Sequence, residues 1–175
     1  MKKHSKAWEV SLLGIMIAVL IAAKVALASL PNIELVSFLI IVFTKKFKRK
    51  MLFVIPAYIV LEILIFGFDV MWVVASLYVW FLLYLLVSIF GKTESSVSLA
   101  ILSGFFGLIF GFLCSFPYLF VISGTNPSAG LSSAIAYWVA GIPFDIIHGI
   151  SNFVIMLALY KSLSSVIDRA IGKTH

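Results

Sequence analysis

The chain has 175 residues, of which 63% are hydrophobic and 11% are charged, and its formal net charge is +6. A soluble domain carries about 25% charged residues, so this composition excludes a soluble protein and indicates an integral membrane protein. The length predicts one membrane domain over residues 1–175, with no room for a separate soluble domain. The single cysteine, Cys114, excludes an internal disulfide and a cysteine-based zinc site.

Apolar segments predict an all-α bundle of six transmembrane helices. A helix needs about twenty residues to cross a bilayer, so the second segment is short for an upright span and the last two are long enough to tilt or protrude. The expected helices span residues 8–29, 32–44, 51–68, 70–90, 96–122 and 131–163.

The basic residues predict how the chain is oriented in the membrane. Twelve of the thirteen lysines and arginines precede the first segment, join the second to the third or the fourth to the fifth, or end the sixth. These places share one side if the chain crosses six times, and the positive-inside rule then puts both termini and the basic loop 45–50 in the cytoplasm. We therefore expect a multi-pass protein of a cell membrane, most naturally a bacterial plasma membrane. A basic loop can also bind nucleic acid, but between two membrane segments it reads as an orientation signal, and we expect no nucleic-acid partner. The remaining basic residue, Lys24, is expected to reach the outer surface from within the first segment.

Small residues recur at helical spacing in two of the segments, where they would let another helix approach closely. They are Ala18, Ala22 and Ala26 in the first segment and Gly104, Gly107 and Gly111 in the fifth. Packing within the bundle explains such a pattern. Docking of an external partner helix is the functional interpretation of the alanine stripe.

The sequence Gly141–Asn152 places polar groups inside an otherwise apolar helix. Asp145, His148 and Asn152 recur at spacings of three and four and therefore share one helical face, and Pro143 loosens the backbone hydrogen bonding of the preceding turn. Ionisable groups cost about 2.5–3.5 kcal/mol each at mid-bilayer, so they usually face a cavity, a partner or a ligand. We interpret this face as one wall of a solute-binding site. A structural Asp145–His148 pair in which each side chain satisfies the other is the alternative.

Further polar and aromatic side chains cluster toward the expected outer side. The members assigned to the binding site are Asn32, Glu34, Glu62, Trp72, Tyr137 and Trp138. An aromatic belt at the membrane interface is an alternative role for tryptophans, and above all for Trp8 and Trp80. Aromatic rings would stack on a flat ligand, and carboxylates would accept hydrogen-bond donors or a cation. The site therefore favours a heteroaromatic vitamin, with a corrinoid as a second option.

No catalytic motif is found. There is no Ser-His-Asp order with a nucleophile elbow, no HExxH and no phosphate-cradling glycine loop. We expect no enzyme activity, no metal and no cofactor, and the absence of an ATP-binding signature means that energy for transport would come from a partner or a gradient. Two alternatives stay open: an intramembrane enzyme with Asp145 and His148 as acid and base, and a membrane scaffold without a ligand.

Taken together, six segments, an alanine stripe in the first, a basic link after the second and the phrase PFDIIHGISN in the sixth resemble the substrate-binding S components of energy-coupling factor (ECF) transporters. Pro143-Phe144-Asp145-Ile146-Ile147-His148 is similar to the Pro-x-Asp-x-x-Lys phrase of biotin-type members. His148-Gly149-Ile150-Ser151 is similar to an Asn-Gly-Ile-Ser phrase in the thiamine-binding member, where the asparagine contacts substrate. His148 stands where those relatives have lysine or asparagine, so the resemblance does not name the ligand.

The resemblance implies a mechanism. An S component binds a vitamin or precursor from outside under a lid formed by the outer links after its first and fifth helices. It then associates with a membrane coupling protein and two ATPases, and topples to release the substrate inside. In this family the alanine stripe of the first helix, here Ala18, Ala22 and Ala26, meets the coupling protein.

Overall fold

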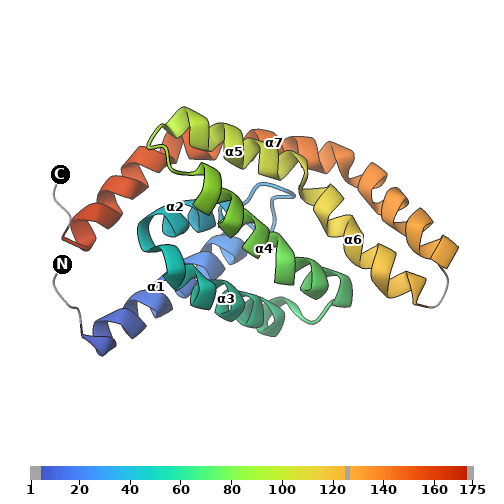
Figure 1. Cartoon of the computed structure of the whole chain (residues 1–175), viewed down its shortest axis with the longest axis horizontal. Helices are drawn as coiled ribbons and strands as arrows, with labels where there is room; N and C mark the ends of the chain where they lie inside the picture. The colour runs from blue at the N-terminus through green and yellow to red at the C-terminus, as the bar shows by residue number, and fades with distance from the viewer. Residues whose placement is uncertain (1–4, 125–126, 173–175) are drawn as a thin grey trace.

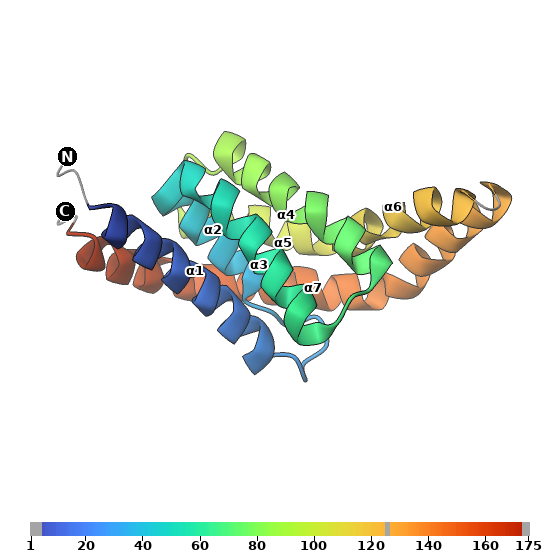
Figure 2. The same cartoon turned by 90° about the horizontal axis from the view of Figure 1, so that it is seen from below.

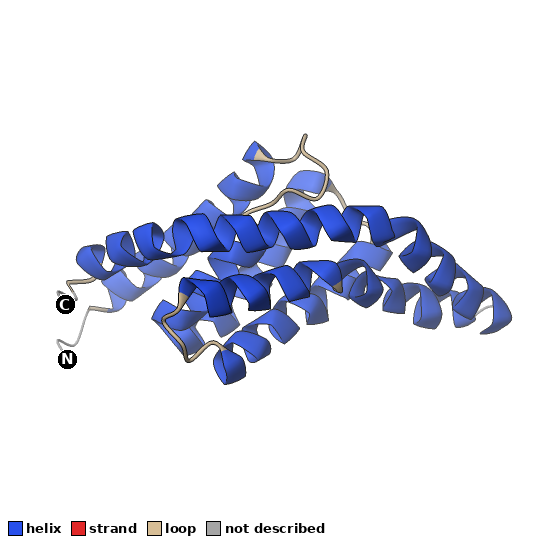
Figure 3. Ribbon diagram, turned by 90° about the horizontal axis from the view of Figure 1, so that it is seen from above, coloured by secondary structure: helices blue, strands red, loops and turns tan. Residues whose placement is uncertain are grey.

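The computed structural model describes residues 5–124 and 127–172, and within these ranges the chain is helical and contains no β-strand (Figure 3). The all-α prediction is confirmed. The lysines at positions 2, 3 and 173, which the orientation argument used, lie outside the described residues. The helices are α1 (Lys6–Ala26), α2 (Val36–Phe47), the short 3-10 helix η1 (Lys48–Lys50), α3 (Met51–Phe66), α4 (Val70–Phe90), α5 (Ser96–Leu108), α6 (Phe110–Ser123) and α7 (Pro127–Ala170).

Four stretches of the described chain are long and apolar enough to cross a membrane: α1, α4, α5 with α6, and α7. By contrast, α2 has 12 residues and α3 has 16. At 1.5 Å per residue these two helices are about 18 and 24 Å long, which is shorter than the roughly 30 Å hydrocarbon core of a bilayer.

The fifth segment is not one straight helix, because it breaks at Ile109 into α5 and α6. These two helices pack one after the other along α7, and α6 with the adjoining first part of α7 projects beyond the other helices (Figures 1 and 2). The helix α7 is continuous through Pro143 but arched in Figure 1, and a proline, which removes one backbone hydrogen bond, is a recognised cause of such bending.

Glycines allow α5 and α7 to meet at backbone distance. A Cβ on Gly107 would lie 2.8 Å from the Gly149 Cα and N, and one on Gly149 would lie 2.5 Å from Leu108 Cγ. Neither position has room for a methyl group, so glycine is required where the two helices cross. For the glycine stripe, packing within the bundle is the role that the structure supports.

The alanine stripe, in contrast to the glycine stripe, lies on an exposed face of its helix. Ala18, Ala22 and Ala26 are exposed, whereas Met16 and Leu20 are the buried residues of α1. The helix therefore packs onto the bundle through a different face, and packing within the chain does not account for the stripe.

Ion pairs gather the basic segments at one end of the molecule, which we call the basic end. Lys50 Nζ lies 2.9 Å from Glu9 Oε1, and Lys46 Nζ lies 2.6 Å from Asp168 Oδ2. Lys45 donates to two carbonyls of the α4–α5 link. The first turn of α1, η1, the α4–α5 link and the last turns of α7 therefore meet, and α1 begins and α7 ends at the same end in all three views (Figures 1–3).

Candidate functional site

A cavity of about 530 Å³ lies at the end of α2 that is remote from the basic end. Its walls come from the end of α1, the link 27–35, and parts of α4, α6 and α7. Six of the nine side chains that the sequence assigned to a binding site line this cavity: Asn32, Glu34, Trp72, Tyr137, Asp145 and His148.

The link between α1 and α2 covers one side of the cavity through a tight turn. The Ile33 N–H donates to the Leu30 carbonyl at 3.4 Å, and Asn32 adopts φ 58°. Proline at the second position and asparagine at the third are the residues favoured by a type II turn, because asparagine tolerates the left-handed conformation. Pro31 and Asn32 thus fold the link back over the site. Described residues of the α6–α7 connection do not line the cavity, although the family resemblance implied a second lid segment there.

Glu34 fastens this link to the two neighbouring helices. Its carboxylate accepts the Ser37 N–H at the start of α2 at 2.9 and 3.1 Å, and its Oε1 lies 3.1 Å from His148 Nε2. Ser151 Oγ adds a hydrogen bond of 3.2 Å to the Asn32 carbonyl. Burial pushes the pKa of Glu34 up, but the hydrogen bond and charge of His148, together with the bonds from Ser37, outweigh burial and leave this pKa below its usual 4.5.

Asp145 joins α7 to the break between α5 and α6. Its Oδ1 accepts the Gly111 N–H at 2.8 Å, and this N–H belongs to the first turn of α6, where helices have donors without a helical acceptor. The aspartate therefore caps α6 from a different helix. A Cβ on Gly111 would lie 2.4 Å from Asp145 Oδ2, so only glycine lets the carboxyl group approach.

Three of the buried residues that line the cavity carry a polar atom with no hydrogen-bond partner in the described part of the chain. These atoms are Asp145 Oδ2, His148 Nδ1 and Trp80 Nε1. The residues are only 5%, 2% and 2% exposed. Leaving a buried polar group unpaired costs about 1–3 kcal/mol, so each of these atoms calls for a hydrogen-bond partner such as an ordered water or a bound molecule. The set offers an indole donor, a carboxyl oxygen and an imidazole nitrogen that can donate or accept.

Lys24 lines the cavity and has an ion partner that the sequence did not predict. Its Nζ lies 2.5 Å from Glu62 Oε1 and 4.6 Å from the centre of the Trp72 ring. An ion partner and an aromatic face together stabilise the ammonium group inside the bundle. Glu62, which the sequence assigned to the binding site, pairs with Lys24 and does not line the cavity.

Two other predicted site residues lie outside the cavity. Trp138 follows Tyr137 by one residue, which turns it by about 100° around α7, and its ring packs against Phe112 of α6 at 5.1 Å. Asn152 is one turn below His148 and fully buried, and its amide has no partner in the described residues.

Trp80 was not assigned to the binding site from the sequence, but it is 2% exposed and lines the cavity. A signal was present, because Trp72 and Trp80 are eight residues apart in α4 and residues at that spacing share a helical face. Phe110, which packs edge-on against His148 at 4.7 Å between ring centres, had no such signal.

The direct Asp145–His148 pair considered from the sequence does not form, because Asp145 binds Gly111 and His148 binds Glu34. No group of three histidine, cysteine, aspartate or glutamate residues in residues 5–124 and 127–172 could hold a metal ion. No protein-family model matches the chain, and comparisons with curated proteins and with solved structures also found no match.

Proposed function

We propose that this chain is the substrate-binding and translocation subunit of an ECF-type importer that takes up a vitamin or a related micronutrient. The supporting observation is the cavity whose buried walls carry three unpartnered polar atoms, on Trp80, Asp145 and His148. A scaffold without a ligand gains nothing from burying such groups, because each one lowers stability unless something binds it.

The cavity supports a small, flat and polar substrate. Its volume of about 530 Å³ lies within the range of about 300–1,000 Å³ that is usual for small-molecule sites. Aromatic side chains line it beside the polar groups, including Trp72, Trp80 and Tyr137. We therefore propose a one- or two-ring heteroaromatic compound that carries both hydrogen-bond donors and acceptors. A volume of this size disfavours the corrinoid alternative.

The proposal includes six membrane crossings with both chain ends in the cytoplasm. The basic end would then lie inside and the cavity would open toward the outside, where an importer meets its substrate. The shorter α2 would cross in the interior of the bundle, where nine of its twelve residues are buried, and α3 would cross at the periphery with one face exposed.

The proposed partners are a membrane coupling protein and two ATPase subunits, which would supply the energy for uptake. The exposed faces of Ala18, Ala22 and Ala26 form a smooth strip over two turns of α1, against which another backbone can pack closely. This strip is the proposed docking surface for the coupling protein.

A single substitution tests the docking surface. In the variant Ala22→Leu the added side chain would hold a partner helix away, so we expect loss of co-purification with the coupling protein and ATPases and loss of uptake. Ligand binding and the melting temperature should stay unchanged, because Ala22 is exposed. The matched control is Ala158→Leu, which changes an exposed alanine of α7 in the same way. Normal complex assembly and uptake in Ala22→Leu would contradict the proposal.

A further inference from the structure

A second cavity, of about 920 Å³, opens at the basic end, on the other side of the molecule from the proposed substrate site. It lies between the ends of α2 and α4 and the last turns of α7. Its charged lining consists of Lys45, Lys46, Lys48, Lys92, Glu94 and Asp168.

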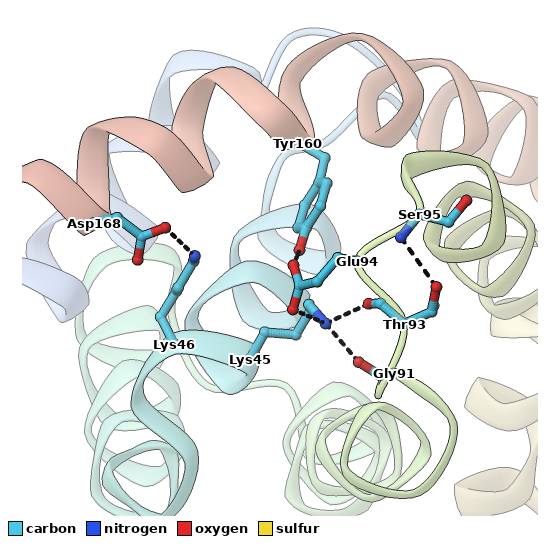
Figure 4. Close-up of polar contacts among 8 residues, drawn as sticks. All are labelled: Lys45, Lys46, Gly91, Thr93, Glu94, Ser95, Tyr160 and Asp168. Carbon is cyan, nitrogen blue, oxygen red and sulfur yellow. Dashed lines mark hydrogen bonds and ion pairs between the residues drawn. The ribbon is translucent and has the colours of Figure 1, made fainter. Parts of the chain in front are cut away.

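Two of these lysines are held in a structural network (Figure 4). Lys45 Nζ donates to the carbonyls of Gly91 and Thr93 at 2.6 Å each and lies 3.2 Å from Glu94 Oε1. Glu94 in turn accepts a hydrogen bond from the Tyr160 hydroxyl of α7. Lys45, whose side chain is only 6% exposed, therefore ties α2 to the α4–α5 link and, through Glu94, to α7.

Lys46 makes the second tie, through its ion pair with Asp168 of α7 at 2.6 Å. Both partners are largely buried, with side chains 12% and 6% exposed. The carboxylates of Glu94 and Asp168 are thus already engaged by Lys45 and Lys46. The two negative charges of these carboxylates do not neutralise the four positive charges of the lysines around the cavity.

The remaining two lysines are the ones that could bind a ligand. Lys48 and Lys92 line the cavity and are exposed, and neither has an ion pair or a side-chain hydrogen bond among the described residues. Thr44 also lines the cavity, is 3% exposed, and has a hydroxyl without a hydrogen-bond partner in the described part of the chain. Two ammonium groups and a hydroxyl donor around one cavity match an anion with several acceptor oxygens.

We propose that this cavity binds a phosphate group, and specifically the phosphodiester headgroup of an anionic membrane phospholipid. Ammonium side chains at the ends of membrane helices lie at the depth of the lipid headgroups, and basic pockets between such helices bind acidic headgroups. Ser88 of α4 lines the cavity, and the flanking Leu85 and Ile89 are 51% and 58% exposed. This apolar face would accommodate the acyl chains below a headgroup held by Lys48 and Lys92.

The experiment uses the full chain in a non-ionic detergent and measures lipid binding by native mass spectrometry. Phosphatidylglycerol is titrated against phosphatidylcholine with the same acyl chains. We expect phosphatidylglycerol to bind more tightly, and the double variant Lys48→Gln/Lys92→Gln to lose roughly thirtyfold of this affinity, about fivefold for each lysine. The control Arg49→Gln/Lys161→Gln removes the same charge from exposed residues that do not line the cavity and should bind like the wild type.

Two further measurements test the role of the Thr44 hydroxyl and the preference for a lipid over a soluble phosphate compound. Thr44→Val removes the unpartnered hydroxyl with almost no change in side-chain volume, so the melting temperature should not fall and the phosphatidylglycerol affinity should drop about tenfold. A titration with sn-glycerol 3-phosphate tests whether the cavity binds a phosphate group of a soluble compound or the headgroup of a lipid. Binding of this soluble compound as tightly as the lipid, with the same dependence on Lys48 and Lys92, would support the phosphate site but not the lipid. Equal binding of both lipids, or phosphatidylglycerol binding that is the same in the lysine variant and its control, would overturn the proposal.

Discussion

Substituting Asp145 by asparagine should separate the two roles of this side chain. Asp145 lines the cavity; its Oδ1 accepts the Gly111 N–H at 2.8 Å, and its Oδ2 is buried without a partner among the described residues. The carboxamide oxygen can keep the bond to Gly111, and aspartate and asparagine cap helices about equally well, so stability should change by less than about 1 kcal/mol. In the variant an NH₂ group replaces the unpartnered oxygen. A ligand donor would then lose a hydrogen bond worth about 1.5–3 kcal/mol, and the dissociation constant should rise between about tenfold and 150-fold.

Intrinsic fluorescence provides the assay, because Trp72 and Trp80 line the cavity. The wild-type protein would be titrated with a panel of B vitamins, and each compound that changes the emission would be titrated into the variant. The control is Asp69→Asn, because Asp69 caps α4 by accepting the Trp72 N–H at 2.8 Å but does not line this cavity. It should leave the affinity within about twofold. Equal affinities for Asp145→Asn and Asp69→Asn would refute the assignment of Asp145 Oδ2 to the ligand.

Three further substitutions test the packing and charge arguments. Gly107→Ala should lower stability by about 1–3 kcal/mol, because its Cβ would lie 2.8 Å from the backbone of α7. Gly14→Ala should raise stability by about 0.5–1 kcal/mol, because no atom lies within 4 Å of its Cβ. Coinciding melting curves for the two variants would contradict this argument. Lys24→Met leaves the Glu62 carboxylate buried without its partner and should cost about 3–5 kcal/mol, and the double variant Lys24→Met/Glu62→Met should be more stable than this single variant. Since the pKa of Glu34 is lowered from 4.5 in the folded protein, its contribution to stability is present above pH 4.5 and is lost as the pH falls through the lower folded value. Wild-type melting temperature should therefore drop in this acid range, and Glu34→Gln should show a smaller drop; the same acid profile in both proteins would argue against the contribution of Glu34.

Where helix ends depend on local residues, the sequence predicted them well. The predicted segment 70–90 coincides with α4, because Asp69 caps its start and Gly91 follows its end. The third helix ends two residues earlier than predicted, at Phe66, because Gly67 takes φ 92°. These signals act within one turn of the chain and are readable without any tertiary contact.

The features that could not be predicted from the sequence depend on contacts between residues that lie far apart in the chain. The break at Ile109 is capped by Asp145, 34 residues away from its partner Gly111, and no proline stands at that point. His148 was paired with Asp145 in one interpretation, but its partner Glu34 is 114 positions away. The ion pair of Lys24 was not predicted because Glu62 belongs to a different helix. Helical spacing tells which side chains share a face, but it does not tell which face of another helix they meet.

The most direct test of the proposed function is to identify what the cavity carries in the cell. Wild-type protein and Asp145→Asn would be purified from host membranes in a mild detergent, denatured, and extracted for small-molecule mass spectrometry. We expect one heteroaromatic compound at close to one molecule per wild-type chain, strongly reduced in the variant, with equal amounts of phospholipid in both. Extracts that contain only phospholipid, or a small molecule present equally in both proteins, would contradict the account of this chain as a substrate-binding subunit.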